Sequence, residues 1–281
     1  MMKIYYESNE GVKLDLLKRP YRLQTGDLFD FQWEYESEIY GDYGGRITKF
    51  KRGVQTKKLT LSISSSNEVQ YYDAINRFCE ATEKDILNRT PGKLYVGNQF
   101  LSCYIYASAK SDWEYDCDML DNEISLVTEN PFWITKSKQS FQKYDESGSN
   151  QYLDFPYDFS YDFTGDQKGI SVLQNDHYAA SHFQMIFYGP VMNPMIIIGG
   201  HTYAVNTTVE ENEYLTIDSK TRSVIRTMAN GTQVNEFNNR GFEQSVFELI
   251  PPGEVAVNWS GDFGFDIILL SERSEPKWIR E

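Results

Sequence analysis

Short hydrophobic segments separated by turn residues dominate the second half of the chain, and helical periodicity is almost absent there. Gly199-Gly200 lies between two β-rich runs, Met195–Ile198 and Tyr203–Val209, and a Gly-Gly pair in that position is a hairpin signal. The number and spacing of such runs predict a β-sandwich. The expected strands are Gln184–Tyr188, Met195–Ile198, Tyr203–Val209, Tyr214–Ile217, Ser223–Thr227, Val246–Leu249, Glu254–Trp259 and Phe265–Leu270.

The first half has the pattern of strands around one helix. Strand-like stretches are Tyr21–Phe31, Leu59–Ile63, Lys93–Tyr106 and Asp118–Val127. We therefore expect a mainly β protein, with a β-rich α+β first half that contains one main helix, followed by a sandwich.

The helix is expected where apolar residues recur every three or four positions, which is typical of one buried face. Residues 65–67 offer N-cap oxygens, Glu68 can close a capping box from Ser65, and Pro91-Gly92 ends the pattern. The expected buried face carries Val69, Tyr72, Ile75, Phe78, Cys79 and Ile86.

Two further segments organise the chain. Glu36–Arg52 is Gly-rich and charged, so we expect an exposed loop or a long hairpin. Asn130–Trp133 (NPFW) closes the first half, and the polar stretch after it reads as a linker or a crossing strand. The predicted parts are an N-terminal domain at 1–134, a linker or crossing segment at 135–152 and a C-terminal domain at 153–281.

The charge balance excludes one class of function. The 281 residues include 41 acidic and 27 basic side chains, a net charge of −14, and non-specific binding of nucleic acid needs clustered Lys and Arg instead. The three cysteines have neither disulfide-framework nor zinc-like spacing, so we expect reduced, packed thiols. No secretory signal and no apolar run of roughly 18 residues is visible, so synthesis in a cytoplasm and no membrane partner are expected.

No residue pattern points to catalysis. His177 and His182 are five residues apart and share no face of a helix or strand, which disfavours a metal site. Asp154, Asp158, Asp162 and Asp166 lack the alternation of a calcium loop, so an extended segment with packed aromatic rings is favoured over a calcium site. No nucleophile elbow, Walker A or dinucleotide fingerprint occurs. We therefore assign no catalytic residue, metal or cofactor.

The order of motifs along the chain resembles the distal tail protein family of long non-contractile-tailed phages. After NPFW and the polar crossing come DFPYDFSYDF at 154–163, YGPVMNP at 188–194 and the ending NWSGDFGFDIILLSERSEPKW at 258–278. The similarity covers nearly the whole chain and is densest from Leu153 to Trp278. Each motif is short, and their shared order carries the resemblance.

The resemblance implies a structural role at a phage or prophage tail tip. The N-terminal domain would assemble into a hexameric ring with an open centre, and a galectin-like β-sandwich would lie outside it. The ring would continue the tail tube and carry the tail-associated lysin or fibre protein and, in some phages, receptor-binding proteins. The family has no catalytic residues to carry over, and no galectin sugar motif is matched here.

Two expectations and two rival functions complete the interpretation. The acidic charge would repel DNA that passes through the ring, so DNA is not bound. Trp113, Trp259 and Trp278 could stack on sugars, so a carbohydrate-binding module for host-surface recognition is the alternative function; an enzyme such as a glycosidase is disfavoured. One loop of the ring-forming half is a candidate for contact with the ring or the tail tube, and the alternative for it is a solvated hairpin. Its residues are Gly41, Asp42, Tyr43, Gly44, Gly45 and Arg46.

Overall fold

The computed structural model describes residues 3–111, 113–114, 118–144 and 170–278. The chain divides into two compact units, Met1–Thr135 with Glu272–Glu281, and Lys136–Ser271. The final residues thus group with the first unit, not with the second. The segment 135–152 begins inside strand β10 (Trp133–Phe141), and its part from residue 145 lies outside the described residues.

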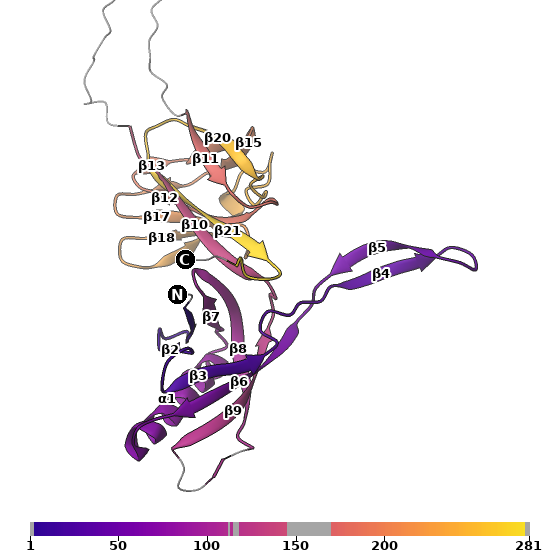
Figure 1. Ribbon diagram of the computed structural model, residues 1–281. Coiled ribbons are helices and arrows are strands. Elements are labelled where there is room, and N and C mark those ends of the chain that lie inside the picture. The colour runs from indigo at the N-terminus through magenta and orange to yellow at the C-terminus, as the bar shows by residue number, and fades with distance from the viewer. Residues whose placement is uncertain (1–2, 112, 115–117, 145–169, 279–281) are drawn as a thin grey trace, which may run out of the picture. The chain divides into compact units, whose positions relative to one another are not determined.

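The first unit is built on an antiparallel sheet whose order is β2-β1-β7-β8-β9-β6-β3 (Figure 1). The long strand β8 pairs with β7 along its first half and with β9 along its second half. Helix α1 (Glu68–Leu87) packs against β6 and β8. The strands are β1 (Ile4–Glu7), β2 (Lys13–Asp15), β3 (Tyr21–Gly26), β6 (Gln55–Ser64), β7 (Gly92–Val96), β8 (Gln99–Ala109) and β9 (Met119–Thr128).

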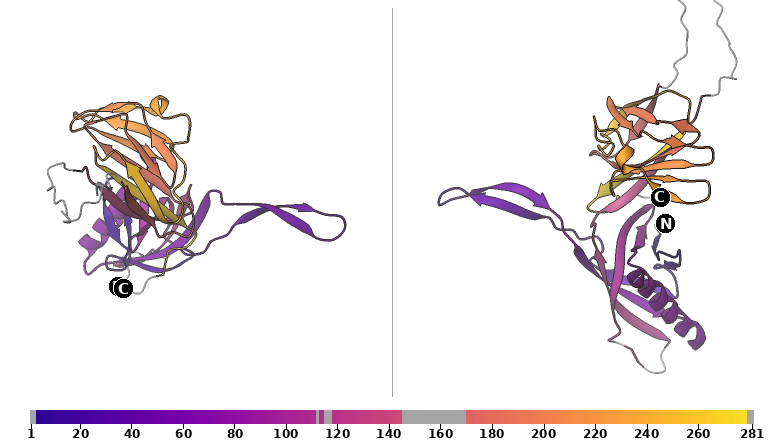
Figure 2. Two further views of the ribbon diagram at one scale, coloured as in Figure 1. Left: turned by 90° about the horizontal axis from the view of Figure 1, so that it is seen from above. Right: turned by 180° about the vertical axis from the view of Figure 1, so that it is seen from behind.

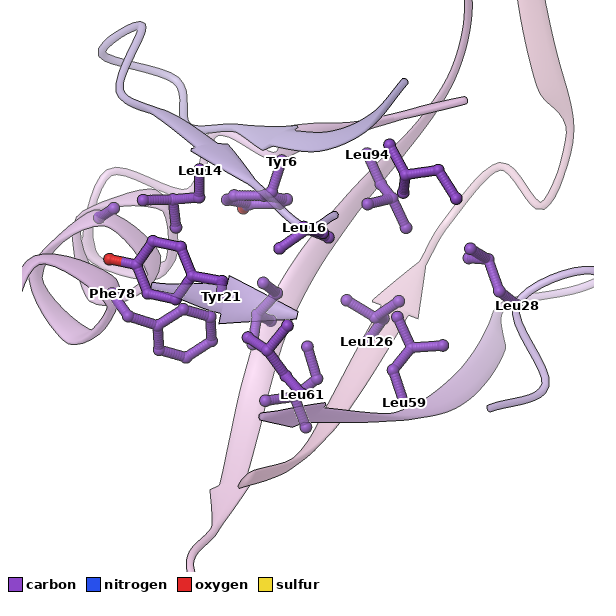
Figure 3. Packing of buried hydrophobic residues seen from close by; sticks show 14 of the residues in the cluster. Tyr6, Leu14, Leu16, Tyr21, Leu28, Leu59, Leu61, Phe78, Leu94 and Leu126 are labelled. Carbon is purple, nitrogen blue, oxygen red and sulfur yellow. The ribbon is translucent and has the colours of Figure 1, made fainter. Parts of the chain in front are cut away.

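The core of this unit lies between the sheet and α1. The predicted alternation in β6 is confirmed, since Leu59, Leu61 and Ile63 are all buried. Figure 3 shows the ring of Tyr21 beside that of Phe78, and their centroids are 6.2 Å apart. The Tyr21 hydroxyl donates a hydrogen bond to the carbonyl of Ala74 at 2.9 Å, so this buried polar atom is satisfied.

The helix exists as expected, and its predicted buried face is right only in part: Phe78 is buried and Ile75 and Cys79 pack against the core, whereas the other three predicted residues do not. Val69 is 71% exposed, and Tyr72 and Ile86 are also exposed. The start is capped by Asn67, whose Oδ1 accepts from the Gln70 backbone N–H at 2.9 Å, and not by a box from Ser65. Alanines allow α1 to approach the sheet closely, so the face that turns inward is less apolar than expected. The buried helix residues are Tyr71, Ala74, Phe78, Ala81, Thr82 and Asp85.

The buried carboxylate of Asp85 fastens the end of α1 to the start of the chain. It accepts a short hydrogen bond from the Tyr6 hydroxyl and one from the Asn9 backbone N–H at 2.8 Å. Burial, and then the bond to Asp85, raise the pKa of Tyr6. A side chain at Gly92 would collide with Tyr6 and Asp85, so only glycine fits at this crossing.

The second unit is a two-sheet sandwich, as the sequence predicted. One sheet has the order β19-β18-β17-β12-β21-β10 and the other β11-β20-β14-β15, and side chains from both share one buried hydrophobic cluster. The galectin-like assignment stays a prediction. The further elements are β11 (Ile170–Asn175), β12 (His182–Tyr188), β13 (Val191–Met192), β14 (Met195–Ile198), β15 (His201–Ala204), β16 (Thr208–Val209), β17 (Tyr214–Asp218), β18 (Ser223–Thr227), β19 (Gln233–Asn235), a 3-10 turn (Phe237–Asn239), β20 (Gly253–Trp259) and β21 (Phe265–Arg273).

The Gly-Gly hairpin is confirmed and one predicted strand is wrong. Gly199 and Gly200 have φ of 58° and 84° and join β14 to β15, which is the left-handed pair that a two-residue turn needs. Val246–Leu249 contains no strand: Glu248 N–H closes a turn on the Ser245 carbonyl at 3.2 Å. Val246 is nevertheless buried, so its apolar character reports burial and not strand pairing.

Candidate functional site

The candidate contact residues predicted from the sequence lie on an isolated hairpin of the first unit. Strands β4 (Glu34–Ile39) and β5 (Gly45–Lys51) pair only with each other, and every residue of both strands is exposed. The views in Figure 2 show the hairpin reaching away from the remainder of its unit. The prediction of an exposed loop or long hairpin over Glu36–Arg52 is thereby resolved as a hairpin. We call residues 34–51 the arm.

The six predicted contact residues gather at the tip of the arm. Gly41 to Gly44 form the turn, while Gly45 and Arg46 begin β5. The turn is closed by the Tyr40 N–H, which donates to the Gly44 carbonyl at 3.2 Å, and Gly41 and Gly44 take φ of 60° and 80°. Tyr43 is 92% exposed. Their role as a ring or tube contact stays a prediction.

The two faces of the arm differ sharply in chemistry. Cross-strand partners point to the same face, so the strand register assigns each paired side chain of the arm to one of two faces. What we call the apolar face carries Tyr35, Ile39, Ile47 and Phe50. What we call the charged face carries Glu34, Glu36, Glu38, Arg46, Lys49 and Lys51.

A bulge at Thr48 creates this separation. The register shifts so that Glu36 pairs with Lys49 and Ser37 pairs with Ile47, which leaves Thr48 without an opposite residue. The Thr48 hydroxyl donates to the Glu36 carbonyl at 3.1 Å and holds the bulge. Since side chains alternate along a strand, the extra residue moves Ile47 onto the apolar face.

The charged face is electrically balanced. Its three glutamates lie opposite Lys51, Lys49 and Arg46 in turn. The Lys51 ammonium also lies 3.0 Å from a carboxylate oxygen of Glu36. The hydrogen bond and charge of Lys51 lower the pKa of Glu36, and the same contact raises the pKa of Lys51. An exposed pair of this kind adds little stability, so its main effect is neutrality.

At the base of the arm, three aromatic rings pack around the guanidinium of Arg52. The Arg52 guanidinium carbon lies 4.8 Å from the ring centroid of Phe132, 5.6 Å from that of Trp33 and 5.9 Å from that of Phe31. Trp33 and Phe132 also meet edge to face at 5.9 Å. We call Phe31, Trp33, Arg52 and Phe132 the base cluster. It joins both ends of the arm to the segment before β10.

The polar side of Arg52 is only partly satisfied. Its Nη2 donates to Gln55 Oε1 at 2.9 Å, and Gln55 Nε2 donates to the Gln32 carbonyl at 3.0 Å. Its Nε and Nη1 are buried and have no hydrogen-bond partner among the described residues. Burial lowers the pKa of Arg52. The contacts with the three aromatic rings therefore provide most of the interaction energy that offsets the cost of removing this cation from water.

The approach to the arm is also fixed, by a buried lysine. Lys57 is 6% exposed, and its ammonium donates to the carbonyls of Asp27, at 3.0 Å, and Asp30. Burial lowers the pKa of Lys57, while the Asp27 and Asp30 charges act in the opposite direction. The loop 27–30 before the arm is thus bound to strand β6.

Two motifs from the sequence meet beside this base. Trp133 of NPFW is buried, with its ring 6.3 Å from that of Phe29, and Trp278 of EPKW lies 4.9 Å from Phe29 on centroids. The backbone N–H of Lys277 donates to Gln99 Oε1 at 2.7 Å, which anchors the chain end. The sequence pattern did not single out Arg52, Trp33 or Lys57. The available signal was aromatic residues next to both ends of a charged, Gly-rich segment.

The other candidate sites gain no support. No group of three or more His, Cys, Asp or Glu side chains that could hold a metal occurs within the described part of the chain, and the acidic run at 154–163 lies outside it. The ring of Trp259 is stacked by Tyr144 at 5.4 Å and met edge-on by Phe141 and Phe265, so it packs in the sandwich. Of the helices that the structure describes, none has the length and apolarity to cross a membrane.

Comparison with known proteins identifies the class of fold. No family model and no curated protein matches the chain. Among solved structures, the SPP1 Dit protein (gp 19.1), a paradigm of the hub adsorption apparatus in phages infecting Gram-positive bacteria, has a TM-score of 0.60 at 9% identity, over 97% of this chain and 99% of that one. A chain of the phage P2 baseplate in its activated conformation with Ca has a TM-score of 0.65 at 11% identity, over 98% and 100%, and the same baseplate with Sr gives 0.64 at 11% over the same shares.

These likenesses establish the fold. The chain has, over almost its full length, the fold of phage hub and baseplate proteins, which is the fold that the order of its motifs implied.

Proposed function

We propose that this chain is a structural protein of a phage or prophage tail tip, which assembles into a ring joining the tail tube to the tail-associated lysin or fibre protein and the adsorption apparatus. The observation that carries the proposal is the match to phage hub and baseplate chains over 97% or more of this chain. A fold by itself does not determine function. Here the match spans both units in their order along the chain, and the motif order independently resembles the same family.

The ring consists of six copies, held together by their first units. A cyclic assembly uses two different surfaces of one chain, one for each neighbour. The arm supplies one of these surfaces, with the tip residues Gly41–Arg46 reaching a neighbouring copy or the tail tube protein. Its full exposure in the single chain supports this role.

DNA passes through the opening of the ring and is not bound. The net charge of −14 supports repulsion of phosphate at the wall. The charged face of the arm is balanced, so the repulsion comes from other acidic residues. The sandwich lies outside the ring and serves attachment of neighbouring tail components, with receptor-binding proteins as further partners. The assembled protein resides in the virion tail tip after synthesis in the host cytoplasm, and it performs no catalysis.

The test is the absolute mass of the purified chain, by light scattering after size exclusion across a concentration range, with negative-stain images of the same fractions. The expected result is a closed ring near six times 32.7 kDa. A chain that remains monomeric at every concentration, and also in the presence of its tail tube protein, would contradict the proposal.

A further inference from the structure

We propose that the side-chain amide of Gln139 takes the place of a neighbouring strand at the edge of β11, and thereby prevents an extended segment of a second copy from adding to the sandwich. The inference goes beyond the proposed function. It concerns the second unit alone and does not depend on whether the chain forms a ring.

Strand β11 is the end strand of its sheet. In the described part of the chain, β20 is the one strand that pairs with it, and Val172 lies opposite Ala256. The Ala256 carbonyl accepts from the Gly199 N–H at 2.9 Å, so the backbone groups of Ala256 point to the β14 side. Because opposite residues of an antiparallel pair alternate between bonded and non-bonded, the backbone groups of Val172 and Gln174 point outward from the sheet.

The amide of Gln139 occupies this outer side. Gln139 lies in β10, which belongs to the other sheet of the sandwich. Its Nε2 donates to the Val172 carbonyl at 2.6 Å, and its Oε1 accepts from the Gln174 N–H at 3.2 Å. One side chain thus satisfies an acceptor and a donor two positions apart, as the N–H and C=O of one residue in an adjacent strand would.

Without this amide the edge of β11 would be well suited to strand addition. Proteins usually protect an edge strand with charged side chains, proline, a bulge or a very short length. Strand β11 (ISVLQN) has six residues, none of them charged or proline, and it pairs with β20 in an unbroken register. The β-branched side chain of Val172 is 49% exposed. The protection of this edge therefore comes from Gln139.

The opposite end of the same sheet provides an internal comparison. At β15, the Thr202 N–H donates a short hydrogen bond to Gln244 Oε1, and the Ala204 carbonyl accepts from the Gly241 N–H at 2.8 Å. A glutamine amide is used here too, but a backbone segment also runs along the edge. Within the described residues, β11 is the end that depends on a glutamine side chain alone.

The test compares four variants of the full chain with the wild type. Gln139→Leu and Gln139→Thr remove the amide and leave the edge of β11 uncharged. Gln139→Lys also loses the bond to Gln174 N–H, but it places a charge at the edge, which opposes strand addition. Gln244→Leu is the matched control, because the backbone cover of β15 remains. Molar mass is measured by light scattering across a concentration range, and exchange of the Gln174 amide by hydrogen exchange.

We expect Gln139→Leu and Gln139→Thr to form species larger than any that the wild type forms at the same concentration. Gln139→Lys and Gln244→Leu should keep the mass of the wild type. In dilute Gln139→Lys the Gln174 amide should exchange about 2- to 10-fold faster than in the wild type, which corresponds to the loss of one neutral hydrogen bond. In Gln139→Leu the same amide should become protected again as the concentration rises.

Wild-type mass for both Gln139→Leu and Gln139→Thr at every concentration would overturn the inference, and Gln139 would then only tie the two sheets together. Equal association of Gln139→Lys would also overturn it, since lower stability and not an open edge would be the cause. Equal association of Gln244→Leu would do the same, because an added leucine would then be sufficient. A wild type that forms no ring would contradict the proposed function but would leave this comparison intact.

Discussion

Arg52 and Phe132 should be energetically coupled, because the base cluster holds the arm by a cation against aromatic rings. The relevant changes are Arg52→Met, which keeps the stem but removes the guanidinium, and Phe132→Leu, which keeps apolar bulk but removes the ring. The two residues lie 80 positions apart in sequence, and the guanidinium carbon is 4.8 Å from the ring centroid.

The single changes are poor reporters, as the magnitudes show. Arg52→Met loses the bond to Gln55, which contributes about 1.5–3 kcal/mol for a charged donor. It also removes two buried N–H groups without partners, each of which costs about 1–3 kcal/mol. The two unpartnered groups together amount to about 2–6 kcal/mol, which opposes the lost bond and can exceed it, so the net effect of the single change does not isolate the ring contact. A partly desolvated cation–π contact contributes about 1–2 kcal/mol and appears directly in the coupling energy.

The assay is a double-mutant cycle on the opening free energy of the arm base, from native-state hydrogen exchange at residues 52–57. We expect a coupling of about 1–2 kcal/mol. Arg46→Met, at the tip of the arm, is the matched control and should be additive with Phe132→Leu to within about 0.3–0.5 kcal/mol. A coupling for Arg52 that falls within that same limit would refute the reasoning.

Three further changes test other parts of the structure. Deletion of Gly41–Gly45 should abolish the ring in light scattering while both units melt unchanged, and an unaltered ring would remove the tip from the contact. Gly92→Ala should lower the free energy of unfolding of the first unit by more than about 2 kcal/mol, because the added methyl group collides with Tyr6 and Asp85. Urea unfolding measures this loss. A loss below about 0.5 kcal/mol, which is typical of a surface substitution, would contradict the predicted collision. In the second unit, the hydrogen bond from Arg226 lowers the pKa of Glu213; burial alone raises the pKa of Glu236, but bonds from Arg226, Asn239 and Thr207 lower it. The pKa values of both glutamates are therefore lowered in the folded protein. The stability that the two carboxylates confer is present above pH 4.5, the ordinary pKa, and is lost as the pH falls through the lowered values. Urea midpoints measured against pH should show this loss, and Arg226→Met should make the midpoints less dependent on pH.

The mainly β fold was accessible from sequence because its signals are local. The Gly199-Gly200 turn lies between its own two strands, and Leu59, Leu61 and Ile63 alternate within one strand. Strand β10 was harder to predict, because the residues in its middle are polar and mostly exposed, and only the two ends of Trp133–Phe141 are buried.

The details of the candidate site depend on contacts that a single sequence does not display. The bulge at Thr48 decides which face Ile47 joins, and its cause is the pairing with β4. Arg52 meets Phe132 only after the chain has folded across most of the first unit. Apolar positions of α1 could be counted, but not divided between the core and the outside, since Ala74 and Ala81 pack inward while Val69 does not.

The return of the chain end to the first unit has a consequence for how such proteins diversify. Trp278 against Phe29 and Lys277 on Gln99 place both borders of residues 136–271 on one unit, so the sandwich is an insertion and not a tail. Recombination could exchange this cassette for another with matching ends while the first unit keeps its core. Variation can thus accumulate in the insert without disturbing the buried core of the first unit.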